Sequence, residues 1–124
     1  MSNILIVDDD VTMTELLKTL LKMEGHTTTA VNDSTKAIEV ASSVNPDLIT
    51  LDLMMPGLSG FELCERLHQD PKFAHTPIII VSASDDVESK GRAMKAGAKD
   101  YVTKPFDADE LMQKIQELTH AQRL

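Results

Sequence analysis

Five short apolar runs alternate with five amphipathic stretches along this chain of 124 residues. The runs cover residues 4–7, 27–31, 48–51, 78–81 and 101–103, and the second run carries the weakest strand signal. Continuous, β-branched runs are typical of strands that are buried on both faces. Strands that alternate with helices predict a parallel sheet joined by right-handed crossovers and covered by helices on both sides. The pattern therefore predicts an α/β fold.

The stretches between the runs carry helical periodicity and terminal signals. The first stripe consists of Met13, Leu16, Leu17, Leu20 and Leu21. Its spacing is that of one helix face, and Gly25 follows it where helices commonly end. Later helix starts are predicted by a capping residue with an acid three positions on: Ser59 with Glu62, Asp85 with Glu88, and Asp107 with Glu110. Gly97 ends the fourth helix, and Phe61, Cys64 and Leu67 form the inner side of the third.

The size and composition of the chain indicate one globular domain over residues 1–124. Hydrophobic residues make up 42% and charged residues 26%, as in soluble proteins. The apolar runs are too short for a membrane span or a signal peptide. Cys64 is the only cysteine, which excludes an internal disulfide and predicts a small buried side chain. These features fit a cytoplasmic protein.

The formal net charge of −8 constrains the partners of the chain. Nucleic-acid binding depends on clusters of Lys and Arg that face phosphates, so the acidic balance argues against it. The same charge favours solubility and basic or cationic partners.

The charged and hydroxyl groups are concentrated at the ends of the predicted strands. Asp8, Asp9 and Asp10 follow the first run, Asp52 follows the third, Ser82 the fourth and Lys104 the fifth. In a parallel α/β sheet the binding crevice lies beyond the carboxyl ends of the strands, so these groups are expected to meet there. Taken singly, each has an ordinary explanation: an Asp such as Asp10 often caps a helix, and a Lys before proline is usually at the surface.

Together, these groups indicate a particular chemistry. Carboxylates that are brought together repel one another, so they share protons or bind a cation. Oxygen ligands of this kind suit Mg²⁺, and a bound cation allows an anionic phosphoryl group to approach. Asp52 is then a credible nucleophile that forms an acyl-phosphate. Lys104 is placed to neutralise a phosphoryl oxygen, and the Ser82 hydroxyl to hydrogen-bond another.

The sequence resembles the receiver domains of bacterial two-component systems, of which the chemotaxis response regulator is the single-domain example. The resemblance covers nearly the whole chain and rests on four segments in order: ILIVDDD, LITLDLMMPGLSG, PIIIVSAS and AGAKDYVTKPF. It implies a flavodoxin-like, doubly wound sheet of five parallel strands in the order 2-1-3-4-5, with five helices.

The resemblance also implies the cofactor and the phosphoacceptor. Asp52 is expected to accept a phosphoryl group from the phosphohistidine of a sensor histidine kinase or a phosphotransfer protein. Asp8 and Asp9 match the acidic pair that holds Mg²⁺, and the backbone carbonyl of Met54, together with Asp52, completes the protein ligands.

Further roles follow from the same resemblance. Lys104 matches the lysine that contacts the phosphoryl group, and Pro105 implies a cis Lys–Pro bond. Ser82 matches the hydroxyl that moves toward the phosphoryl group, and Tyr101 the aromatic switch residue that turns inward with it. On the sequence alone, Tyr101 is equally well explained as a half-buried aromatic on an edge strand.

Phosphorylation is expected to shift the population toward an active state. The implied readout surface is the fourth helix, fifth strand and fifth helix, at about residues 87–118, which would control a protein partner or an output domain and could support dimerisation. The resemblance also implies that Met54 and Ser84 flank the path of the hydrolytic water. Neither side chain is acidic or an amide, so slow to moderate autodephosphorylation is predicted.

Two other families are weighed against this interpretation, and one question about the rest of the protein stays open. A haloacid-dehalogenase-type phosphatase needs a second Asp two residues after the first, where this chain has Met54. A flavin-binding domain needs a phosphate loop after the first strand, where Asp8, Asp9 and Asp10 would repel phosphate. Whether the domain acts alone or as part of a longer regulator is left open by the sequence.

Overall fold

The computed structural model describes residues 2–123 and contains one parallel sheet with the strand order β2-β1-β3-β4-β5. The strands are β1 (Asn3–Val7), β2 (Thr27–Val31), β3 (Leu48–Leu51), β4 (Ile78–Ser82) and β5 (Asp100–Thr103). Each strand agrees with a predicted run to within one residue at either end. The predicted doubly wound fold and its strand order are therefore confirmed.

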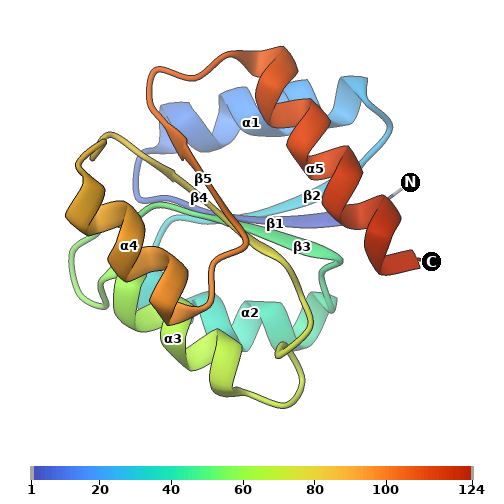
Figure 1. Cartoon of the computed structure of the whole chain (residues 1–124). Coiled ribbons are helices and arrows are strands. Elements are labelled where there is room, and N and C mark those ends of the chain that lie inside the picture. Colours follow the sequence, from blue (N-terminus) through green and yellow to red (C-terminus); the bar gives the residue numbers. More distant parts are fainter. Residues whose placement is uncertain (1, 124) are drawn as a thin grey trace.

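Helices cover both faces of the sheet (Figure 1). The helices are α1 (Val11–Met23), α2 (Ala37–Val44), α3 (Gly60–Gln69), α4 (Val87–Ala96) and α5 (Ala108–Arg123), and a short 3-10 helix, η1 (Ser34–Lys36), precedes α2. Figure 1 shows α1 and α5 on one face and α2, α3 and α4 on the other. No helix in residues 2–123 combines the length and the apolar character that crossing a bilayer requires.

Two hydrophobic cores lie on the two faces of the sheet. Side chains alternate along each strand, so Ile4 and Ile6 of β1 pack toward α1 and α5, while Leu5 and Val7 pack toward the other three helices. Strands that are apolar on both faces are the reason why the runs in the sequence are continuous.

Two predicted details of the helices are wrong. Asp86, not Asp85, caps α4, because its carboxylate accepts a hydrogen bond from the Ser89 N–H at 2.9 Å and the helix begins one residue later than expected. In α1, Leu16 is 46% exposed, since the helix turns its Leu17 and Leu21 side toward the sheet.

The inner side of α3 also differs in part from the prediction. Cys64 and Leu67 are buried as expected, together with Leu63. Phe61 is only partly buried, and the guanidinium of Arg92 lies 4.1 Å from the centre of its ring. The predicted caps at Ser59 and Asp107 are present, as is the end of α4 at Gly97.

Candidate functional site

Three carboxylates converge at the carboxyl end of the sheet. Oxygen atoms of Asp8, Asp9 and Asp52 all lie within 4.8 Å of one another. They meet because β1 and β3 are neighbours whose last residues, Val7 and Leu51, are in register, so the chain leaves both strands at the same point. Asp8 and Asp52 are buried, and Asp9 is exposed.

Lys104 reaches this carboxylate cluster from the end of β5. Its ammonium lies 2.7 Å from Oδ2 of Asp8 and 3.6 Å from Oδ2 of Asp52. The Lys104 backbone N–H donates to the carbonyl of Ser82 at 2.8 Å, which fixes the loop after β5 to the end of β4. The Lys104–Pro105 peptide bond is cis, and Pro105 itself is exposed.

The electrostatics of the cluster favour an additional cation. Burial raises the pKa of Asp52, and the charge of Asp8 raises it further, while Lys104 partly offsets both effects. Burial alone would lower the pKa of Lys104, but its hydrogen bond to Asp8 and the charge of Asp52 raise that pKa instead. Three carboxylates thus face one ammonium.

The donor set fits Mg²⁺. Carboxylate oxygens are hard ligands, and Mg²⁺ in proteins commonly binds one or two carboxylates and keeps several waters. The exposed side chain of Asp9 leaves one side of the cluster open to such waters. The cluster could therefore hold a metal ion through Asp8, Asp9 and Asp52.

The loop after β3 lies close to Asp52. The backbone N–H of Met54 approaches Oδ1 of Asp52 at 3.4 Å, and the Met54 side chain is 66% exposed. The chain returns to Asp52 at Gly60, where a β-carbon would overlap the Asp52 carbonyl oxygen. Glycine is therefore required at the start of α3, a requirement that the capping motif in the sequence did not reveal.

Ser82 and Tyr101 are linked through Ser84. Ser82 is buried, and its hydroxyl oxygen accepts a hydrogen bond from the Ser84 N–H at 3.3 Å. The Tyr101 hydroxyl donates to the carbonyl of the same Ser84. Tyr101 is half-buried on the edge strand β5, and its hydroxyl joins this strand to the loop after β4.

Asn32 and Ser34 also contact the loops of the site, although the sequence analysis did not select them. The Asn32 amide donates to the carbonyl of Asp8 at 2.8 Å. The Ser34 hydroxyl is hydrogen-bonded to the loop that follows Asp52. Polar residues between a strand and a helix normally indicate only a turn, so the sequence held no signal for these contacts.

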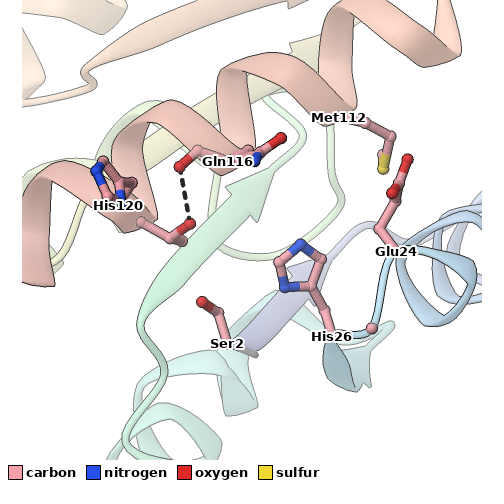
Figure 2. A pocket seen from close by; sticks show the side chains of 8 residues that line it. Ser2, Glu24, His26, Met112, Gln116 and His120 are labelled. Carbon is pink, nitrogen blue, oxygen red and sulfur yellow. Dashed lines mark hydrogen bonds between the residues drawn. The ribbon is translucent and has the colours of Figure 1, made fainter.

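A separate hollow lies away from the carboxylate cluster. It has a volume of about 460 Å³ and is lined by Ser2, Glu24, Gly25, His26, Met112, Gln116, Thr119 and His120. Figure 2 shows the His26 ring directed toward α5, where the Thr119 hydroxyl donates to the Gln116 carbonyl at 3.2 Å. Ser2 precedes β1 and His26 precedes β2, so this hollow lies at the opposite ends of the strands from the carboxylates.

Comparison with known proteins identifies the family. The family model described as the response regulator receiver domain matches residues 4–116. The chain belongs to this family. Receiver domains are phosphoacceptor modules of two-component signalling, and the cluster of Asp8, Asp9 and Asp52 is the acidic pocket of this one. Membership decides against the dehalogenase-type phosphatases and the flavin-binding domains.

Individual relatives agree with this family. The chain is 37% identical over 118 residues to the DNA-binding dual master transcriptional regulator RpaA of Synechocystis sp., covering 95% of this chain and 49% of RpaA. It thus spans about half the length of the curated relatives it matches. Among solved structures, the receiver domain of the Francisella response regulator 1452 is 35% identical with a TM-score of 0.91, covering 98% of this chain and 99% of that one. The chemotaxis protein CheY4 of Vibrio cholerae is 25% identical with a TM-score of 0.89, covering 95% and 98%.

Proposed function

We propose that residues 1–124 form one receiver domain, a cytoplasmic switch of a two-component system that is phosphorylated on Asp52. The observation that carries the proposal is the convergence of three carboxylates within 4.8 Å, with Lys104 bonded to one of them. Such a cluster is costly to assemble, because like charges repel in a buried site, and a site for a cation and a phosphoryl group accounts for it.

Mg²⁺ would be held by Asp8, Asp9, Asp52 and the backbone carbonyl of Met54. When bound, it would neutralise the carboxylates and attract the oxygens of the incoming phosphoryl group. The return of the chain at Gly60 supports this ligand set, because it holds the loop with Met54 against Asp52.

The phosphoryl donor would be the phosphohistidine of a sensor histidine kinase or of a phosphotransfer protein. A carboxylate oxygen of Asp52 attacks the phosphorus, an O–P bond forms, the N–P bond breaks, and its electron pair stays on the imidazole nitrogen. Lys104 is placed to pair with one phosphoryl oxygen, and the Ser82 hydroxyl to donate to another.

The switch would begin at Ser82. Its hydroxyl oxygen accepts from the Ser84 N–H in the present arrangement. The phosphoryl group, which adds roughly −1.5 to −2 charges, would accept the hydroxyl proton and draw the Ser82 side chain toward Asp52. Tyr101 is bonded to the same Ser84 and would follow, which changes the surface formed by α4, β5 and α5. That surface would control a protein partner or an output domain, or form a dimer. Direct nucleic-acid binding is not expected of this domain.

The phosphorylated state would decay slowly to moderately, and the domain would catalyse only its own phosphotransfer and dephosphorylation. Met54 and Ser84 flank the path of the attacking water. A thioether and a hydroxyl orient water less well than a carboxylate or an amide.

The test is incubation with Mg²⁺ and acetyl phosphate, followed by the intact mass of the protein. We expect one added phosphoryl group in the wild type and none in Asp52→Asn. Asp109→Asn, at the exposed start of α5, is the matched control and should be modified like the wild type. An unmodified wild type, or a modified Asp52→Asn variant, would overturn the proposal.

A further inference from the structure

The turn after β2, residues 32–35, touches both loops that carry the acidic residues. The end of β2 adds no side chain to the cluster of Asp8, Asp9 and Asp52. The strand lies beside β1 at the edge of the sheet. The turn that follows it is nevertheless hydrogen-bonded to the loop after β1 and also to the loop after β3.

The first half of this turn holds the backbone of Asp8. The Asp8 N–H donates to the carbonyl of Val31 at 3.1 Å, and the Asp8 carbonyl accepts from the Asn32 amide at 2.8 Å. The same amide donates to the Thr14 hydroxyl of α1 at 3.2 Å. Both polar groups of the Asp8 backbone are therefore fixed by the end of β2.

The second half of the turn holds the loop after Asp52. Ser34 is only 2% exposed, and its hydroxyl donates to the carbonyl of Pro56 at 3.1 Å while accepting from the N–H of Leu58 at 3.1 Å. Gly57, between them, has a φ of +82°, and a β-carbon there would lie 3.3 Å from Cγ2 of Thr35. The two segments are thus in close contact as well as hydrogen-bonded.

Asp33 fixes the orientation of Ser34. Its carboxylate accepts from the backbone N–H of Thr35 at 3.0 Å and from the Thr35 hydroxyl at 2.7 Å. Asp33 thereby caps η1, which begins at Ser34, so the serine hydroxyl is presented by a closed turn and not by a free loop.

The loop that Ser34 holds is the one that begins at Asp52. Its Met54 N–H faces Oδ1 of Asp52, and its far end packs against the Asp52 carbonyl at Gly60. Ser34 bonds the middle of this loop. The position of the Met54 carbonyl relative to Asp8 therefore depends on a chain of contacts through residues 32–35.

We propose that Ser34 is a positioning residue of the phosphoacceptor site, and that the 32–35 turn sets the spacing between the loop of Asp8 and Asp9 and the loop after Asp52. This inference rests on the proposed function, because it concerns how well the site holds Mg²⁺ before phosphotransfer. Neither Asn32 nor Ser34 needs to touch the cation, since hydrogen bonds that orient the ligands of a metal site affect its affinity strongly.

The test compares Ser34→Ala with the wild type by isothermal titration calorimetry with Mg²⁺ alone. We expect the Mg²⁺ dissociation constant to rise roughly 10-fold, as for the loss of an outer-shell partner. The rate of phosphorylation by acetyl phosphate should fall at low Mg²⁺ and return to the wild-type rate at saturating Mg²⁺. This separation of affinity from maximal rate distinguishes positioning from a general loss of stability.

Thr119→Ala is the matched control for stability. It removes another buried hydroxyl, which donates to the Ile115 carbonyl of α5 at 2.8 Å, away from the carboxylates. We expect it to lower the melting temperature and to leave the Mg²⁺ dissociation constant unchanged. Asn32→Ala, at an exposed position, repeats the test on the other half of the turn. It replaces Ser34→Ala in the comparison if Ser34→Ala does not fold.

The outcomes separate the two proposals. If the wild type binds Mg²⁺ and is phosphorylated, but Ser34→Ala and Asn32→Ala keep the wild-type dissociation constant, the positioning role is wrong and the proposed function stands. If the wild type neither binds Mg²⁺ nor accepts a phosphoryl group, the proposed function fails, and the role of Ser34 fails with it.

Discussion

The ammonium of Lys104 is hydrogen-bonded to Asp8 at 2.7 Å and is in longer ionic contact with Asp52 at 3.6 Å. Asp8 thus holds the lysine beside Asp52, the proposed phosphoacceptor, while the longer distance leaves Asp52 without a direct hydrogen bond from it. A phosphoryl group on Asp52 would bring new oxygens within reach of the same ammonium, so the lysine could change partners with little movement of its backbone.

Replacing Lys104 should destabilise the protein in the absence of Mg²⁺. Lys104→Met leaves two buried carboxylates without their cation, and we expect a loss of about 2–3 kcal/mol in the free energy of unfolding at neutral pH. Urea unfolding measures this loss. Lys114→Met is the control, because its ion pair with Asp100 is more exposed and should be worth less than about 1 kcal/mol. Equal losses in both variants would contradict the electrostatic picture of the site.

Replacing Asp52 should have the opposite effect on stability. Its pKa is raised in the folded protein, so ionisation of Asp52 disfavours folding above that pKa. Asp52→Asn should therefore raise the melting temperature at neutral pH in Mg²⁺-free buffer, and the gain should vanish as pH falls below the ordinary Asp pKa of about 3.9.

The control for this effect is an aspartate with the opposite shift. Hydrogen bonds from Ser89 lower the pKa of Asp86 at the start of α4, so its ionised form favours folding. Asp86→Ala should lower the melting temperature at neutral pH, and this loss should shrink as the pH falls through the lowered pKa. The same sign of change in both variants would rule out this account.

Mg²⁺ should stabilise the protein through the carboxylate cluster. We expect the melting temperature to rise with Mg²⁺ concentration, each tenfold increase above the dissociation constant adding about 1.4 kcal/mol, and EDTA to reverse it. Asp9→Asn should weaken the effect without unfolding the protein, because Asp9 is exposed. Differential scanning fluorimetry measures the shift, and an equal response in wild type and Asp9→Asn would remove Asp9 from the ligand set.

Tyr101 should titrate above an ordinary tyrosine. Burial raises its pKa, a hydrogen bond with Ser82 lowers it, and the charges of Asp86, Asp52 and Asp85 raise it, with a net upward shift. It is the only tyrosine and there is no tryptophan, so tyrosinate absorbance reports it directly. We expect a midpoint above 10 in the folded protein and near about 10 in denaturant. The free energy of unfolding should accordingly fall as the pH rises through the pKa that Tyr101 has in the unfolded chain. Identical midpoints in the folded and denatured protein would disprove the shift.

Thr50 should be replaceable with a gain in stability. It is buried in β3, and its hydroxyl has no hydrogen-bond partner among the described residues. Thr50→Val removes this group, and we expect about 1 kcal/mol of stabilisation in urea unfolding. Thr119→Val is the comparison, since it removes a hydroxyl that is bonded to Ile115 and should destabilise. A loss of stability in Thr50→Val would indicate an internal water at this site.

The sequence was sufficient to predict the elements and the residues that meet at the end of the sheet. Buried parallel strands need apolar side chains on both faces, so residues 4–7 and 48–51 were visible as strands without any alignment. Parallel topology then required the groups after them, Asp8 and Asp52, to leave the sheet at the same edge.

What the sequence did not predict depends on contacts between distant turns. Ser34 is bonded to residues more than twenty positions away, and a polar residue in a turn carries no sign of such a partner. The start of α4 was misplaced by one residue because Asp85 and Asp86 are equally good caps in isolation.

One link from Ser82 to Tyr101 passes through the main chain of Ser84, whose N–H donates to the Ser82 hydroxyl and whose carbonyl accepts from the Tyr101 hydroxyl. A side-chain replacement at position 84 therefore leaves both hydrogen bonds available, with proline, which lacks the N–H, as the exception. Under the proposed function, evolution could alter the Ser84 side chain, and with it the duration of the signal, while the hydrogen bonds that join Ser82, Ser84 and Tyr101 stayed unchanged. The lifetime of the phosphorylated state would then depend on the side chain of this residue, and the coupling of Ser82 to Tyr101 on its main chain.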